Sequence, residues 1–168
     1  MTTLAVPQQV FAVDAQAMVV RHARVADAPA ISALICSWSD HGFTLRRSVG
    51  EVLSLINAFV VVEAAGEIIA CACVEDCGRH LGEVRSVAVA EKAKGLGAGK
   101  AVLAGVVKAA DESGIKELYL LTKIPAWFER GGFAEVPVAD LPSWWVRERV
   151  LDAGRSLEGR SAMCRKVP

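Results

Sequence analysis

Alternating glycines between Lys94 and Lys100 give the chain a loop of the composition that binds phosphate groups. The loop follows a Val-rich run and precedes apolar residues spaced like one face of a helix. A helix begins with unpaired N–H groups and a positive dipole, and glycine lets an anion approach the main chain closely. We therefore expect the loop to bind a phosphate group, with added positive charge from the two lysines. A tight turn into a surface helix is the alternative. The residues expected to bind are Lys94, Gly95, Leu96, Gly97, Ala98, Gly99 and Lys100.

Two common phosphate-binding motifs do not match this loop. The dinucleotide fingerprint has a different glycine spacing and an acid about 20 residues later that binds ribose. A Walker loop requires Ser or Thr after Gly-Lys, whereas Gly99-Lys100 is followed by Ala101. Both motifs are therefore excluded.

The elements that must position the loop alternate between strands and helices. The pattern predicts strands near 18–25, 59–63, 68–74, 83–89, 117–121, 133–138 and 162–167. Helices are expected over 27–38, 48–56, 99–110, 126–130 and 144–151, with Asp27 as the first N-cap and a Ser48–Glu51 capping box at the second. Hairpins in the middle and a crossover helix on either side of the fifth strand indicate an α/β fold, a mixed sheet with helices on both faces.

The composition is that of one globular domain, which we expect over residues 18–168. Hydrophobic residues make up 53% of the 168 and charged residues 23%, and the formal net charge of zero argues against nucleic-acid partners. The sequence has no apolar run of membrane-spanning length and no signal-peptide pattern, so we expect a cytoplasmic protein without membrane association. Residues 1–17 are apolar but aperiodic and predict an N-terminal arm, which in a homodimer would pack on the partner subunit.

Three of the five cysteines, Cys71, Cys73 and Cys77, crowd one predicted strand and its exit. A metal site would need cysteine pairs at turn spacing with histidines nearby. His80 is close to Cys77, but no second pair follows. We therefore expect buried, reduced thiols and no metal.

The spacing basic-x-x-Gly-x-Gly after a Val-rich strand, and the order of the elements, resemble the GNAT superfamily of N-acetyltransferases. The resemblance implies the GNAT fold, acetyl-CoA as co-substrate and a loop whose amides hold the coenzyme pyrophosphate. Lys94 departs from the Arg or Gln that usually opens the motif. The segment Trp127 to Phe133 resembles the family segment beside the coenzyme thiol, but Phe128 stands where most members have Tyr as general acid.

Three further matches resemble the acetyltransferase domain of bacterial N-acetylglutamate synthases. They are Leu45-Arg46-Arg47-Ser48, Leu121-Thr122 before Trp127, and Asp140-Leu141-Pro142. Gly159-Arg160-Ser161 is similar to the Arg-x-Ser ending of that subfamily but lacks the intervening residue. The resemblance implies a short-form synthase without the kinase-like domain. Two departures are a loop over 122–126 that is one residue short and a poor match beyond Pro142.

The resemblance implies a role for each site residue. Glu83, directly after Gly82, stands where the family places the general base, and the N–H groups of Val87, Ala88 and Val89 would meet the tetrahedral oxyanion. Phe128 would contact the coenzyme. Arginine and lysine are suited to the two carboxylates of glutamate. The candidates for that role are Arg47, Arg85, Lys123 and Arg160.

These residues predict an enzyme that transfers acetyl from acetyl-CoA to the α-amine of glutamate, by direct transfer in a ternary complex, for arginine biosynthesis. Two alternatives stay open at this stage. One is a GNAT enzyme for another small amine, an amino-acid analogue or a protein amine. The other is a CoA-binding module without catalysis.

Overall fold

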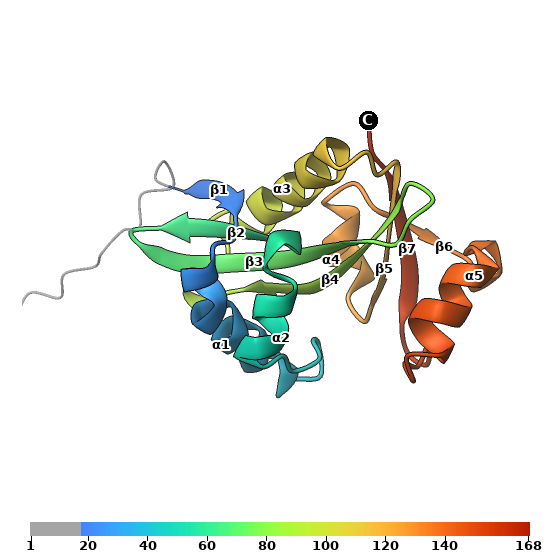
Figure 1. The fold of residues 1–168 in the computed structure, drawn as a ribbon, viewed down its shortest axis with the longest axis horizontal. Helices are drawn as coiled ribbons and strands as arrows, with labels where there is room; N and C mark the ends of the chain where they lie inside the picture. Colours follow the sequence, from blue (N-terminus) through green and yellow to red (C-terminus); the bar gives the residue numbers. More distant parts are fainter. Residues whose placement is uncertain (1–17) are drawn as a thin grey trace, which may run out of the picture.

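The computed structural model describes residues 18–168, so the expected arm over 1–17 lies outside the described residues. The strands form one sheet (Figure 1). They are β1 (Val19–His22), β2 (Phe59–Ala64), β3 (Glu67–Asp76), β4 (Leu81–Val89), β5 (Glu117–Thr122), β6 (Ala134–Val136) and β7 (Ser161–Lys166). The helices are α1 (Ala28–Ser39), α2 (Val49–Ser54), α3 (Ala98–Glu112), α4 (Pro125–Glu129) and α5 (Ser143–Val146), and a π-helical turn (Arg147–Leu151) follows α5.

The seven strands lie in the order β1-β2-β3-β4-β5-β7-β6. Neighbouring strands are antiparallel except β4 and β5, which are parallel. The predicted mixed sheet is therefore confirmed. The closing strand, predicted near 162–167, is not at an edge: β7 lies between β5 and β6 and pairs with both.

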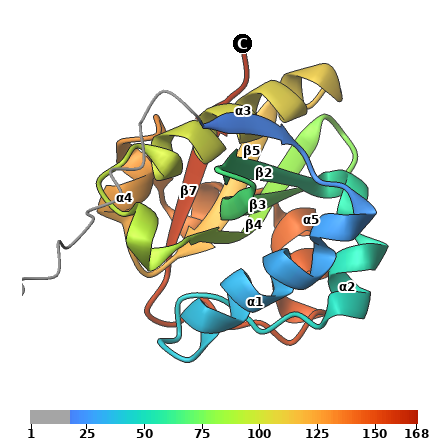
Figure 2. The same ribbon diagram turned by 90° about the vertical axis from the view of Figure 1, so that its left-hand side faces the viewer.

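Helices cover the two faces of the sheet in separate groups (Figure 2). On one face, α3 and α4 pack with the apolar side chains of β2 to β5 in the largest core cluster. On the other face, α1 and α2 pack over β2 and β3, while α5 and the π turn pack over β5 and β7. On this second face α1 also packs against β4, where Ala88 belongs to the same cluster.

Local signals place the helix starts. The capping box of α2 is confirmed, because Glu51 N donates to Ser48 Oγ at 3.2 Å and Ser48 N donates to Glu51 Oε2 at 2.7 Å. Asp27 stands at the N-cap position of α1, but its side chain does not cap that helix. Its carboxylate instead accepts from Arg24 N and from Arg21, at 2.7 Å in each case.

The strands β4 and β5 separate halfway along their length. They pair only from Leu81–Glu117 to Glu83–Tyr119, although β4 continues to Val89. In β4 one extra residue stands opposite β3, since Cys71 faces Ala88 while Cys73 faces Arg85. Ser86 in this bulge has φ of +53°, a strained value for a non-glycine residue. The bulge and the separation open the sheet at its centre.

Of the three crowded thiols predicted to be buried, Cys71 and Cys73 are buried, whereas Cys77 is half-buried. Cys71 and Cys73 share a face under α1, and burial raises the pKa of Cys71 to about 12. Within residues 18–168, no group of three or more His, Cys, Asp or Glu is arranged to hold a metal ion. In the same range, no helix is both long and apolar enough to cross a membrane.

Candidate active site

A cavity of about 750 Å³ occupies the opening between β4 and β5. Its wall combines the end of α1 and the loop after it, β4, the glycine loop, β5, α4 and the segment 153–160. Most of the predicted site residues lie together on this wall, namely Arg47, Arg85, Val87, Ala88, Val89, Lys94, Gly95, Gly97, Ala98, Gly99, Phe128 and Arg160. Of the predicted residues, Glu83, Leu96, Lys100 and Lys123 do not line it.

The glycine loop presents unpaired amides at the entrance to α3. Among residues 18–168, the N–H groups of Gly95, Gly97, Ala98, Gly99 and Lys100 have no protein acceptor, while Leu96 N donates to Ala93 O. Gly95 and Gly97 have φ of +76° and +87°, which L residues rarely adopt. A Cβ on Gly99 would come within 2.6 Å of the Trp127 ring. The loop can therefore turn tightly, pack on α4 and offer N–H donors to an anion.

Aromatic side chains form the apolar part of the wall. Phe128 is buried and makes edge contacts with Trp127 and Phe133 at centroid distances of 4.8 and 5.9 Å. On the other side, Trp38 Nε1 donates to Val89 O at 2.8 Å, and Lys94 Nζ lies 4.9 Å from the Trp38 ring centroid. These contacts give the cavity an apolar lining next to the glycine loop.

No phenol faces the cavity in the described part of the chain. Tyr119, the single tyrosine, is buried on β5, and its hydroxyl donates to Glu117 at 3.0 Å. Burial raises the pKa of this phenol above its usual value. Tyr119 therefore does not replace the tyrosine that the family resemblance leads us to expect as general acid at position 128, where this chain has phenylalanine.

Of the three basic residues Arg46, Arg47 and Lys123, only Arg47 lines the cavity. Arg47 Nε donates to Ser86 Oγ at 2.7 Å, so its guanidinium reaches the bulge of β4. Arg46 points away, is exposed, and pairs with Asp40 at 2.9 Å. Lys123 is also exposed, and its Nζ lies near Gly42 rather than on the cavity wall.

Glu83 lies behind the cavity wall and is completely buried. Arg149 Nε donates to its Oε2 at 2.7 Å and Arg155 Nη1 donates to its Oε1 at 2.5 Å. Arg85 Nε is 3.8 Å from the same Oε1. The carboxylate is therefore held in a network of guanidinium groups rather than open to an acceptor amine.

Sequence reasoning missed Glu75, Ser86, Arg149 and Arg155 as members of this network. One available signal was Glu75, because an acid near the end of an otherwise apolar strand needs a buried cation. No pattern in the segment after Pro142 distinguished the arginines that reach the site from those that face solvent.

Comparison with known proteins agrees with this geometry. The model of the Acetyltransferase (GNAT) family matches residues 30–133, more than half of the chain. An uncharacterised N-acetyltransferase of Chlorobaculum tepidum is 33% identical over 117 residues, which cover 70% of this chain and 76% of that protein. The amino-acid acetyltransferase of Pasteurella multocida is 33% identical over 127 residues, 73% of this chain and 28% of that one.

The fold is also similar to a solved structure with bound ligands. The N-acetylglutamate synthase of Neisseria gonorrhoeae, complexed with coenzyme A and N-acetyl-glutamate, superposes with a TM-score of 0.79 at 27% identity. The match covers 90% of this chain and 35% of the gonococcal chain, so this chain corresponds to one part of that protein. The chain belongs to the GNAT family and is an N-acetyltransferase related to the amino-acid acetyltransferases.

Proposed function

We propose that this enzyme transfers the acetyl group of acetyl-CoA to the α-amine of glutamate. The observation that carries the proposal is the charge of the cavity wall. Arg47, Arg85, Arg155 and Arg160 all line the cavity, and its lining, as the described residues form it, contains no Asp or Glu. An acceptor with two carboxylates matches such a wall because guanidinium groups bind carboxylates in pairs of hydrogen bonds.

The charge balance around the cavity supports a dicarboxylate. Behind the wall, Arg149 adds a fifth guanidinium, and the carboxylates of Glu75 and Glu83 offset two of the five. Three positive charges remain for the acceptor. Glutamate brings two carboxylates and an ammonium, whereas a simple amine would bring only more positive charge.

The coenzyme would enter from the opposite end of the same cavity. The unpaired amides from Gly95 to Lys100 would hold its diphosphate, and Phe128 would contact the arm that carries the thioester. The acetyl carbonyl would then lie where β4 leaves β5, within reach of N–H groups of Val87 to Val89. The coenzyme A in the gonococcal relative supports this assignment.

In the reaction, the amine nitrogen forms a bond to the acetyl carbon, and the C–S bond breaks with its electron pair on sulfur. The α-ammonium must first lose a proton, and Glu83 is our candidate base. Because Glu83 is buried and both its oxygens accept from arginine, a water molecule would carry the proton to it. As the tetrahedral intermediate collapses, the nitrogen loses its second proton to solvent, and the thiolate, which has no neighbouring phenol, takes its own proton from solvent.

Two adjacent arginines provide a matched test. With Arg47→Gln, we expect the KM for glutamate to rise at least about tenfold, since a charge-assisted hydrogen bond contributes about 1.5–3 kcal/mol. With Arg46→Gln, which removes the exposed neighbour, the KM for glutamate and the KM for acetyl-CoA should both stay unchanged.

The parent enzyme is also assayed with a panel of amines. Saturable turnover with glutamate, above that with aspartate, glutamine and simple amines, supports the proposal. It would also agree with the role in arginine biosynthesis that the family resemblance implies. No turnover with glutamate or glutamine would refute it and favour another acceptor amine. No turnover with any amine would favour a CoA-binding module.

A further inference from the structure

Two acids face each other directly across neighbouring strands beneath the active site. Glu75 of β3 and Glu83 of β4 are register partners. Glu83 is completely buried, and the side chain of Glu75 is 16% exposed. Like charges directly opposite each other in a sheet are destabilising, and a buried carboxylate requires a partner of opposite charge. The pair can therefore stay ionised only where cations lie between the two carboxylates.

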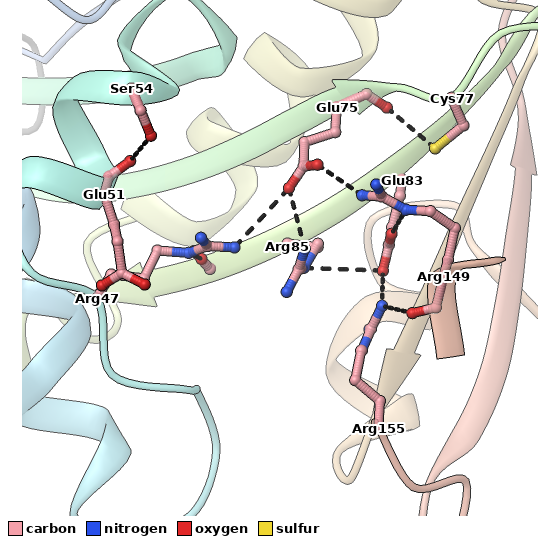
Figure 3. A network of polar contacts seen from close by, with 10 residues as sticks. Arg47, Glu51, Ser54, Glu75, Cys77, Glu83, Arg85, Arg149 and Arg155 are labelled. Carbon is pink, nitrogen blue, oxygen red and sulfur yellow. Dashed lines mark hydrogen bonds and ion pairs between the residues drawn. The ribbon is translucent and has the colours of Figure 1, made fainter. Parts of the chain in front are cut away.

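Two arginines, Arg85 and Arg149, bridge the carboxylates of Glu75 and Glu83 (Figure 3). Arg149 donates from Nη2 to Glu75 Oε2 at 2.6 Å and from Nε to Glu83 Oε2 at 2.7 Å. Arg85 lies at the other two oxygens, with Nη1 3.1 Å from Glu75 Oε1 and Nε 3.8 Å from Glu83 Oε1. Each carboxylate thus has one oxygen toward each bridging arginine.

The same acids also hold arginines of the cavity wall. Arg47 Nη2 lies 3.8 Å from Glu75 Oε1, and Arg155 Nη1 lies 2.5 Å from Glu83 Oε1. Arg155 Nη1 also donates to the main-chain oxygen of Arg149 at 2.8 Å. Of the four arginines around the pair, Arg47, Arg85 and Arg155 line the cavity and Arg149 does not.

The position of Arg149 depends on the π-helical turn after α5, in which Val150 is completely buried, as is Trp145 of α5 just before it. Such turns in helices are rare and occur often at functional sites. Arg149 is thus brought from the far end of the sequence to a place on the acid pair that the wall arginines do not occupy.

We propose that Arg149 is a positioning residue for the acceptor site: it neutralises the opposed acids so that Arg47, Arg85 and Arg155 keep their guanidinium groups directed at the substrate carboxylates. The part of this inference that concerns substrate rests on the proposed acceptor. Without Arg149, the two acids would compete for the three wall arginines and draw them away from the cavity.

The titration of Glu75 agrees with this role. Burial by itself raises the pKa of Glu75, but the hydrogen bond from Arg149 and the charges of Arg149, Arg85 and Arg47 lower it below its usual value. The charged and titratable groups that face the acid pair are Arg47, Cys73, Cys77, Arg85, Arg149 and Arg155. The arginine that bonds Glu75 most directly is therefore the one outside the cavity.

The kinetic test compares Arg149→Met with Arg147→Met. Arg147 is exposed in the same π turn and makes no side-chain ion pair among the described residues, so its variant controls for the turn itself. For Arg149→Met we expect the KM for glutamate to rise about tenfold or more while the KM for acetyl-CoA changes less than about twofold. Arg149→Lys, which keeps the charge but loses the planar fork that spans the two acids, should give a smaller rise in the KM for glutamate. Arg149→Lys also takes the place of Arg149→Met in this comparison if Arg149→Met does not fold.

A second measurement needs no substrate. The urea midpoint of each variant is compared with that of the parent at pH 7 and pH 5. In the parent, the pKa of Glu75 is lower in the folded protein than in the unfolded chain. The ionised carboxylate therefore stabilises the fold at pH values above the unfolded-state pKa, and this stabilisation is lost as the pH falls. In Arg149→Met, Glu75 loses the hydrogen bond that lowers its pKa and gains a proton more readily, so the stability deficit of this variant should be larger at pH 7 than at pH 5. Adding Glu75→Gln to Arg149→Met should recover part of the deficit at pH 7.

The two arms separate this inference from the proposed function. Unchanged KM values in Arg149→Met, or a stability deficit equal at both pH values, would overturn the role of Arg149. A parent without activity on glutamate would refute the proposed acceptor, and the unfolding arm would still decide whether Arg149 neutralises the acid pair.

Discussion

The glycine loop provides the sharpest test of the site, through Gly97→Val. Gly97 has φ of +87° at the N-terminus of α3, and no atom of the protein lies within 4 Å of a Cβ placed there. The valine side chain would therefore extend into open space beside the unpaired amides rather than into the core. It would obstruct an anion without disturbing packing.

Gly114, just beyond the other end of α3, is a matched control. It has φ of +74° and equally open space around a Cβ. A side chain in the left-handed region costs about 1–2 kcal/mol, so Gly97→Val and Gly114→Val should lose similar stability in urea unfolding. A difference in coenzyme affinity between them then reports the loop and not the backbone strain.

The expected affinity loss follows from the hydrogen bonds that the valine obstructs. Each bond from an amide to a charged group contributes about 1.5–3 kcal/mol, and 1.4 kcal/mol corresponds to a factor of ten in Kd. Loss of one bond predicts a Kd for CoA that rises about 10- to 100-fold in Gly97→Val. Titration calorimetry at fixed salt measures it. A folded Gly97→Val that binds CoA as the parent does, or an equal loss in Gly114→Val, would refute phosphate binding by these amides.

Two further predictions concern stability and thiol chemistry. Asp27→Asn should cost about 1–2 kcal/mol in urea unfolding at pH 7, because Asp27 accepts two hydrogen bonds from Arg21. The hydrogen bond from Arg21 lowers the pKa of Asp27, so the parent should lose its stability advantage over Asp27→Asn as the pH falls below the pKa of Asp27 in the unfolded chain. An unfolding free energy that changes equally with pH in parent and variant would contradict this prediction. Iodoacetamide at pH 8 should leave Cys71 unmodified in the native protein and alkylate it in urea, because burial raises its thiol pKa to about 12; mass spectrometry of the labelled peptides would expose any native labelling.

Much of the fold could be predicted because its signals are local. The apolar stripe from Gly99 to Ala110 predicted α3, which spans Ala98–Glu112, and the Ser48–Glu51 pair predicted the start of α2. The glycine loop was also recognisable, since its residue types and its place between a strand and a helix are both properties of a short segment. Such signals depend on neighbours along the chain and survive without knowledge of the rest of the molecule.

Contacts between distant segments could not be predicted in this way. The place of β7 between β5 and β6 depends on which strand edge is free when the chain returns. Glu83 was predicted from the sequence as the general base, but its hydrogen-bond partners Arg149 and Arg155 lie 66 and 72 residues further along the chain.

The sequence by itself determined the elements, the glycine loop and the family resemblance, because each is encoded in short stretches of residue types. Only the tertiary structure decided which arginines line the cavity and which acids hold them. An arginine on a surface helix and one on a buried carboxylate have the same local sequence signature. They differ only in desolvation and in the partner that the fold brings to them.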